Sequence, residues 1–231
     1  MYIHHLLYWY LLVCILFGCT HLSQAQQNTK KKQTMHTSSL AQQLEDSGYR
    51  QLFLTGKQKG AKEIWQEGKN KNALEKLLAD ENTSLYAQFL AIEILRRFKV
   101  DVDSKHNSQL AKAYTYALKH SSADQKKYSS ITGNAWGLLY EEDHLGHLGK
   151  QMVALGKSAI PELVKLLDNN HGKILYEGSE EATIGNGYQY RIKDFAAFYL
   201  SKITQTPITF YQDLAKRDAE IERFKKALPK N

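Results

Sequence analysis

Apolar residues recur at every third or fourth position through most of this chain, and this spacing constrains the fold more than any other feature of the sequence. The pattern is clearest between residues 155 and 203, where two apolar stripes flank a polar insertion. The first stripe contains Leu163, Leu166 and Leu167. The second contains Ile192, Phe195, Ala196, Tyr199, Leu200 and Ile203. Together they predict two amphipathic helices that pack as a hairpin.

The same spacing predicts helices in the other parts of the chain, at residues 39–54, 61–80, 84–98, 110–120, 128–140 and 208–228. Gly48 is expected to break or kink the first of them, Gly68 to divide the second, and Ser84 to cap the third. The last helix is expected either to cover the end of the helical stack or to dock on a partner helix. Its apolar stripe contains Phe210, Tyr211, Leu214, Ile221, Phe224 and Leu228. We therefore expect residues 38–231 to form one all-α domain.

The first 19 residues differ from the rest, because they contain no Lys, Arg, Asp or Glu and are apolar without interruption from Leu6 to Gly18. This length is typical of the apolar core of a secretory signal peptide and is short for a membrane-spanning helix. The motif Leu-Phe-Gly-Cys that ends at Cys19 resembles the lipobox of bacterial lipoproteins. Phe17 is bulkier than the usual residue, and the segment before the apolar core carries His where Lys or Arg is expected.

The resemblance implies that residues 1–18 are a signal peptide and that Cys19 becomes the lipidated first residue of the mature chain. Cleavage after Ala25 and an uncleaved membrane anchor are the two alternatives, and all three export the chain. The only cysteines are Cys14 and Cys19, so the mature domain is expected to have no disulfide.

Residues 19–37 are polar, include Lys30, Lys31 and Lys32, and are expected to form a flexible tether. The net charge of +7 favours acidic partners such as anionic lipid or an acidic protein, and no nucleic-acid-binding motif is present.

Two segments of the chain resemble each other: residues 73–98, and residues 160–170 joined to 190–203. In each, a helix that ends in a Leu-Leu pair and an Asp leads to a second helix with a small Ala four residues before a Leu, which allows close helix approach. The stretches LGKSAIPEL, from Leu155 to Leu163, and RIKDFAA, from Arg191 to Ala197, are similar to the two helices of a HEAT repeat. This resemblance covers about a third of the chain and implies stacked helical hairpins that bind or scaffold other proteins, usually without catalytic residues.

The polar insertion, residues 169–189, contains four glycines and is therefore not expected to be helical throughout. Residues 173–176 and 182–184 are predicted to pair as a small β-hairpin. An insertion of this length indicates either a recognition loop or a structural lid over a helix end. If it recognises a partner, the candidate contact residues in and beside it are Tyr176, Glu177, Glu180, Glu181, Tyr188, Tyr190 and Arg191. Arg191 and Asp194 are also interpreted as a polar pair that ties neighbouring hairpins together.

No catalytic or metal-binding constellation is predicted. Glu180 and Glu181 are adjacent, and adjacent carboxylates seldom converge on one substrate atom. His144 and His147 are spaced for one helix face, but no third ligand follows at a useful interval. We therefore predict no cofactor and no enzymatic activity. The leading hypothesis is a lipid-anchored protein of the bacterial cell envelope, on the periplasmic or outer-membrane side, that acts as a protein-binding or scaffold module. An immunity lipoprotein against a periplasmic toxin and an envelope hydrolase or sugar-binding protein are the alternatives.

Overall fold

The computed structural model describes residues 39–123, 131–141, 143–170 and 172–228. These residues are helical and contain no strand, which confirms the predicted all-α class. The signal peptide, Cys19 and the tether lie outside the described residues. After a first helix over residues 39–49, the elements follow in this order: η1 Arg50–Leu54, η2 Gly56–Gln58, α2 Lys59–Trp65, η3 Gln66–Gly68, α3 Lys71–Ala79, α4 Leu85–Arg97, η4 Ser104–His106, α5 Asn107–His120, α6 Gly133–Trp136, α7 His147–Ala154, η5 Gly156–Ala159, α8 Ile160–Val164, α9 Glu180–Tyr188, α10 Ile192–Thr204 and α11 Leu214–Ala227.

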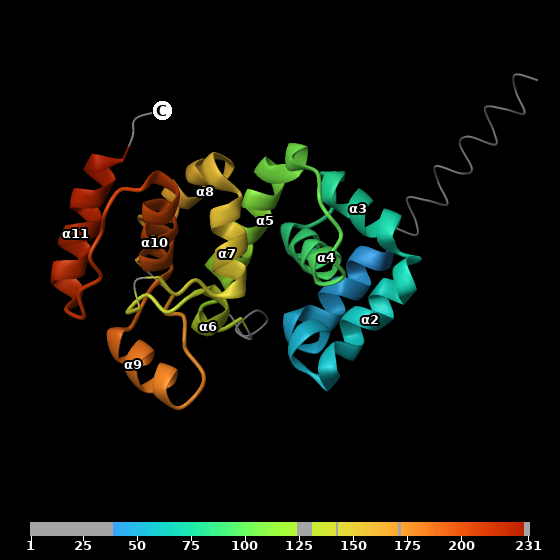
Figure 1. Cartoon of the computed structure of the whole chain (residues 1–231), viewed down its shortest axis with the longest axis horizontal. Helices are drawn as coiled ribbons and strands as arrows, with labels where there is room; N and C mark the ends of the chain where they lie inside the picture. The colour runs from blue at the N-terminus through green and yellow to red at the C-terminus, as the bar shows by residue number, and fades with distance from the viewer. Residues whose placement is uncertain (1–38, 124–130, 142, 171, 229–231) are drawn as a thin grey trace, which may run out of the picture.

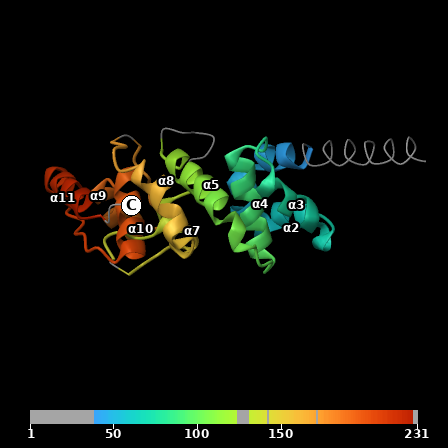
Figure 2. The same ribbon diagram turned by 90° about the horizontal axis from the view of Figure 1, so that it is seen from above.

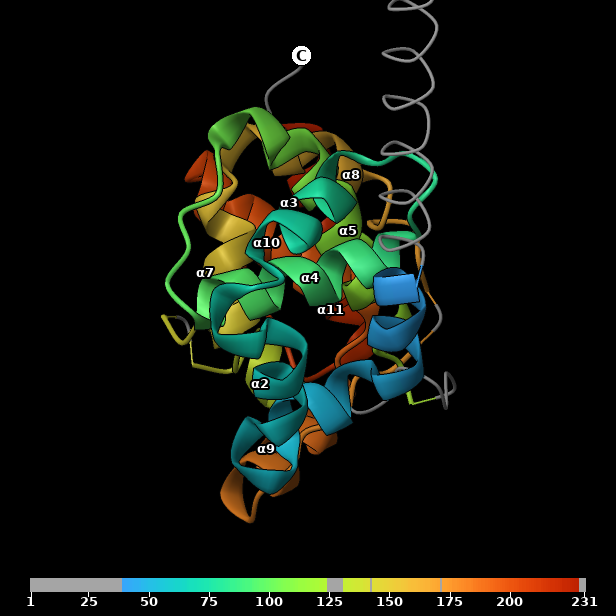
Figure 3. The ribbon, with the colours of Figure 1, turned by 90° about the vertical axis from the view of Figure 1, so that its right-hand side faces the viewer.

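The helices are arranged in a row along the long axis of the molecule, from the N-terminal helices at one end to α11 at the other (Figure 1, Figure 2). Each helix packs mainly on its neighbours in the row: α3 on α4, α4 on α5, and α8 on α10. The pairs α3–α4 and α8–α10 are those that the sequence predicted as hairpins. Helix α9 extends from one side of the row, as the end-on view in Figure 3 also shows.

The N-terminal part follows the sequence-based expectations closely. Leu40, Leu44 and Leu52 are buried as the apolar spacing predicts. Gly48 has a φ of +63° and separates the first helix from the π-helical turn η1, which confirms the predicted kink. Ser84 caps α4, because its Oγ accepts a hydrogen bond of 3.1 Å from the backbone N–H of Ala87.

The predicted helix over residues 128–140 is wrong within its described part, where only the four residues of α6 are helical. Helix α6 ends at Gly137, whose φ of +144° is a backbone conformation that favours glycine. The chain then turns and forms an isolated antiparallel bridge between Gly137 and Leu145. Residues 128–130 lie outside the described residues.

The predicted β-hairpin within the insertion is also wrong, because residues 182–184 belong to helix α9. The stretch that begins at Gly172 pairs instead with the chain just before α10. Lys173 and Arg191 form an isolated antiparallel bridge, and the N–H of Ile174 donates to the carbonyl of Tyr190 at 3.0 Å. The insertion is therefore closed at its base by contacts between its two ends.

Tyr176 packs the insertion against the domain. Its buried ring lies between Gly133 of α6 and Gly185 of α9, where a Cβ on either glycine would come within 2.5 Å of the ring. Its hydroxyl donates to the carbonyl of Gly137 at 2.9 Å, and its N–H donates to Oδ1 of Asn186 at 2.8 Å. These contacts fix α9 against α6, so the insertion is an integral part of the fold.

The two glycines of α9 allow a matched test of this packing. Gly185→Ala places a methyl group against the Tyr176 ring and is expected to destabilise the protein by about 1–3 kcal/mol through overpacking. Gly187→Ala meets only the end of Gln212 at 3.9 Å and is expected to be neutral or to stabilise the helix by up to about 1 kcal/mol. Urea unfolding followed by circular dichroism measures both, and equal effects of the two substitutions would contradict the described packing.

Buried charges join α10 to α11. The Asp194 carboxylate is fully buried and accepts hydrogen bonds from the N–H of Arg191 at 2.7 Å and from the Arg191 guanidinium at 3.2 Å. Nε of Arg217, on α11, lies 3.5 Å from Asp194. The predicted Arg191–Asp194 pair is therefore present, and it continues into the next helix.

A second carboxylate extends this network toward the surface. Asp218, on α11, is paired with Arg191 at 2.6 Å and with Nζ of Lys193 at 2.8 Å. Arg217 also donates to the carbonyl of Tyr188 at 2.8 Å, which attaches the end of α9. We call these five side chains (Arg191, Lys193, Asp194, Arg217 and Asp218) the charged clamp. It holds the ends of α9 and α10 and the first turns of α11 together.

The charged clamp is expected to make the stability depend on pH below neutrality. The hydrogen bond from Arg191, together with Lys193, lowers the pKa of Asp218 to about 2, below the value of about 3.9 in an unfolded chain. A carboxyl group with a lowered pKa stabilises the fold above its unfolded pKa and loses this contribution as the pH falls through its folded pKa.

We expect Asp218→Asn to lower the free energy of unfolding by about 1 kcal/mol at pH 7, a modest value because the side chain is 43% exposed. The difference from the wild type should shrink between pH 4 and pH 2. Urea titrations at several pH values measure this difference. Asp143→Asn, on a fully exposed side chain, is the control and should show no such trend. A difference that stays constant down to pH 2 would contradict the assignment to Asp218.

Candidate functional site

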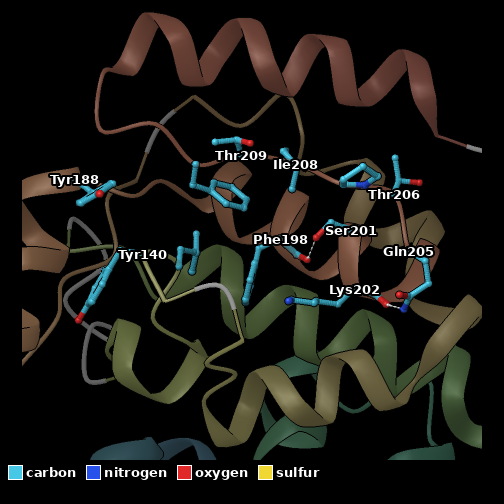
Figure 4. A pocket seen from close by; sticks show the side chains of 12 residues that line it. Tyr140, Tyr188, Phe198, Ser201, Lys202, Gln205, Thr206, Ile208 and Thr209 are labelled. Carbon is cyan, nitrogen blue, oxygen red and sulfur yellow. Dashed lines mark hydrogen bonds between the residues drawn. The ribbon is translucent and has the colours of Figure 1, made fainter.

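A groove of about 440 Å³ lies between the C-terminal half of α10 and the segment that connects α10 to α11, residues 205–213. We call it the aromatic groove, and Figure 4 shows its walls. It combines residues from four separate parts of the chain. Its lining residues are Leu139, Tyr140, Tyr188, Phe198, Ser201, Lys202, Gln205, Thr206, Pro207, Ile208, Thr209 and Phe210.

The connecting segment is extended, so the predicted helix over residues 208–228 is wrong before Leu214. Two local features explain the difference. Pro207 and the β-branched residues around it favour extended backbone. Asp213 caps α11, because its carboxylate accepts a hydrogen bond of 2.8 Å from the N–H of Lys216. Part of the predicted apolar stripe is therefore exposed at Tyr211 and Leu214, whereas Ile221 and Phe224 are buried as predicted.

Burial alternates along the connecting segment. The side chains of Thr206, Ile208 and Phe210 are half-buried, whereas those of Pro207, Thr209 and Tyr211 are exposed. This period of two is the pattern of a β-strand with one face covered. The segment thus has the side-chain arrangement of a strand. It is not part of a sheet, because the described residues contain no strand that pairs with it.

Aromatic rings form a continuous floor for the groove. The centroids of Phe198 and Phe210 are 5.9 Å apart with the rings edge to face, and Phe210 meets Tyr190 in the same way at 6.3 Å. Tyr190 in turn stacks on Tyr188 at 5.1 Å, and Tyr188 lies 6.1 Å from Tyr140. Such contacts stabilise the ring positions, which gives the groove preformed aromatic walls beside its polar residues.

The two ends of the groove differ in charge. Tyr140 and Tyr188 lie at one end, and Lys202 and Gln205 lie at the other (Figure 4). Burial raises the pKa of Tyr140, and the negative charges of Glu141, Glu181 and Glu180 raise it further. The Tyr140 end is therefore acidic. At the other end Lys202 lies 5.4 Å from the Phe198 ring centre and pairs with the exposed Asp143 at 3.1 Å.

The structure separates the predicted contact residues into two groups. Glu177 and Glu180 are exposed, and Glu181 and Tyr188 are half-buried, so these four remain accessible. Tyr176, Tyr190 and Arg191 are at most 9% exposed. Their side chains serve the packing of the insertion, the aromatic cluster beneath the groove and the charged clamp, and their role as partner contacts stays a prediction. Of the whole set, only Tyr188 lines the groove.

Two titratable groups outside the groove, His147 and Glu93, have structural partners. His147 shares a hydrogen bond of 2.8 Å with the hydroxyl of Tyr49, which joins α7 to the N-terminal part. The buried Glu93 accepts a hydrogen bond from Tyr114, and burial raises the pKa of Glu93. Within the described residues, no group of three or more His, Cys, Asp or Glu side chains is arranged to hold a metal ion.

A second, more open hollow lies at the opposite end of the molecule. Trp65 stacks on Phe98 there, with ring centres 4.7 Å apart, and Lys59, Lys62 and Lys69 surround the pair. Apart from Phe98, its walls come from one short stretch, residues 59–69. We favour the aromatic groove as the candidate site because it assembles distant parts of the chain around a built aromatic floor.

Sequence reasoning missed the groove because it assigned residues 208–228 to one helix. The signal was present in the sequence, since Thr206-Pro207-Ile208-Thr209-Phe210 combines proline with β-branched and aromatic residues, and a capping Asp follows. That signal predicts an extended segment before the helix. The positions of Ser201 and Lys202 at the groove could not be recognised without knowing where this segment runs.

Comparisons with protein-family models, with curated proteins and with solved structures give no match for this chain. No helix in the described part of the chain is long and apolar enough to span a membrane. The features of this chain that bear on its function are therefore the geometry and charge of the groove and the N-terminal sequence.

Proposed function

We propose that this protein is a non-enzymatic protein-binding module that takes an extended segment of a partner protein in the aromatic groove. The observation that carries the proposal is the preformed aromatic floor between α10 and the connecting segment. Aromatic side chains provide large, rigid contact surfaces and are enriched where proteins bind each other. The volume of about 440 Å³ is in the range of a site that takes a few side chains.

The arrangement of the buried titratable groups supports a binding role over a catalytic one. Asp194 is engaged in the charged clamp, and Glu93 is engaged with Tyr114. Ser201, at the groove, donates its hydroxyl to the carbonyl of Phe198 in its own helix. Glu180 is exposed on α9, where water screens it and where it suits electrostatic attraction of a partner.

The N-terminal sequence supports a location at a bacterial membrane. We propose that lipid on Cys19 anchors the domain to the cell envelope and that Lys30, Lys31 and Lys32 add weak attraction to anionic headgroups. The paired helices α3–α4 and α8–α10 are consistent with a HEAT-like stack of hairpins, in which one face serves as a scaffold. In this arrangement the N-terminal helices lie at one end of the row, and the groove lies near the other end.

Lipid attachment has a direct test with a matched control in the same segment. Expressed in a Gram-negative host, the chain is expected to incorporate an alkyne analogue of palmitate and to fractionate with membranes. Cys19→Ser should abolish the label and release the protein into the soluble envelope fraction, whereas Cys14→Ser should change neither. A mature N-terminus at Gln26 in the wild type, or lipid label on Cys19→Ser, would contradict the proposal.

The groove can be tested by photo-crosslinking in the native membrane fraction. A benzoylphenylalanine at Thr209, which is exposed at the groove edge, should give a discrete crosslinked partner band, and the same probe at the exposed Lys112 should not. Ser201→Trp fills the groove and is expected to reduce the crosslink about tenfold, equivalent to about 1.4 kcal/mol. The control is Ser108→Trp on the exposed surface of α5, which should leave the crosslink unchanged. Equal yields from both tryptophan variants would refute binding in the groove.

A further inference from the structure

The connecting segment has two backbone edges with different partners. In an extended chain the N–H and C=O of one residue point to one edge, and those of the next residue point to the opposite edge. Helix α11 binds the edge formed by the odd-numbered residues. Nη2 of Arg223 donates to the carbonyl of Pro207 at 3.0 Å, and Glu220 accepts from the N–H of Thr209 at 3.3 Å.

The opposite edge has free hydrogen-bonding groups. It is formed by the even-numbered residues Thr206, Ile208 and Phe210, of which Thr206 already donates its N–H to Oγ1 of Thr204 at 3.4 Å. No hydrogen bond within the described residues reaches the N–H or C=O of Ile208 or Phe210. Because α11 binds the odd-numbered edge, we infer that the even-numbered edge faces away from α11; Figure 4 shows the groove residues of α10 on that side of the segment.

An unpaired strand edge beside an apolar floor is the arrangement that strand addition requires. Natural proteins usually protect such edges, because main-chain groups there pair readily with another chain. In strand addition, main-chain hydrogen bonds supply affinity and alternate side chains of the added strand enter pockets that supply specificity. Here the floor of Phe198 and Phe210 provides the surface for those alternate side chains.

We propose that the partner segment adds as a β-strand along the free edge of residues 206–210, with every second side chain apolar and a Lys or Arg at the Tyr140 end. This inference rests on the proposed function and specifies its partner chemistry. The basic residue is expected because carboxylates lie on the elements that form this end: Glu141 directly follows Tyr140, and Glu180 and Glu181 are in the first turn of α9, which ends at Tyr188.

The test uses the full chain in lipid nanodiscs and a phage-displayed library of random dodecapeptides, with empty nanodiscs as the counter-selection. The enriched peptides are synthesised, and binding is measured by fluorescence anisotropy. The expected peptides have apolar residues at alternate positions and a Lys or Arg near one end. Each residue of the peptide is then N-methylated in turn, which removes its backbone N–H. Because only one edge of the peptide pairs with the protein, N-methylation is expected to weaken binding about tenfold at every second peptide residue and less than about twofold at the residues between them.

Variants of the protein test the same edge. Ile208→Pro removes an N–H from the free edge and is expected to weaken peptide binding about tenfold, whereas Ile208→Val keeps this N–H and should retain it. Thermal unfolding establishes that both variants fold, and the N-methyl scan on the wild-type protein tests the proposal independently of them. The double variant Glu180→Gln, Glu181→Gln should weaken the binding of peptides that contain the Lys or Arg. It should leave unchanged the binding of analogues in which norleucine, which is uncharged, replaces that residue.

The outcomes distinguish this inference from the proposed function. Enriched peptides whose binding is sensitive to Ser201→Trp but insensitive to N-methylation would overturn strand addition and leave the groove as a binding site. Selection that yields no peptide sensitive to Ser201→Trp would count against both. A homodimer of the full chain that crosslinks through Ile208 would show that a second copy occupies the edge and would overturn the proposal of a separate partner.

Discussion

The buried carboxylate of Asp194 determines much of the C-terminal half of this protein. A charge that is removed from water is tolerated only when hydrogen-bond donors or opposite charges surround it; here Arg191 donates hydrogen bonds to the carboxylate, and Arg217 of α11 forms an ion pair with it. Arg191 precedes α10 and Arg217 belongs to α11, so the requirement to satisfy Asp194 fixes the position of one helix on the other. Arg217 also attaches the end of α9, and the insertion is thereby held to the same point.

The position of α11 then determines the form of the candidate site. The connecting segment must bridge the end of α10 and the start of α11, and α11 holds one of its edges through Glu220 and Arg223. This leaves the segment extended, with half-buried side chains facing α10 and the aromatic groove between them. The groove is thus a consequence of how α11 is attached, and removing a partner of Asp194 should affect binding as well as stability.

The sequence predicts the elements whose signals are local and leaves unpredicted those that depend on distant contacts. The helical class, the kink at Gly48 and the cap at Ser84 follow from spacing and residue type, and the structure confirms them. The base of the insertion could not be predicted, because Lys173 pairs with Arg191 across the whole of α9. Tyr176 and Tyr190 were predicted as contact residues because they lie in and beside a polar loop, but tertiary packing buries both.

The single-file arrangement of the helices has a consequence for how the protein opens. Each helix contacts mainly its neighbours: α5 packs on α4 on one side and on α7 and α8 on the other, and a hydrogen bond of 2.8 Å between Tyr49 and His147 adds to this link. In such an array, local unfolding is not shared by the whole molecule, so regions far apart can differ in their protection from hydrogen exchange. The first helices are therefore expected to exchange their amide protons at rates that differ from those of the charged clamp and the groove.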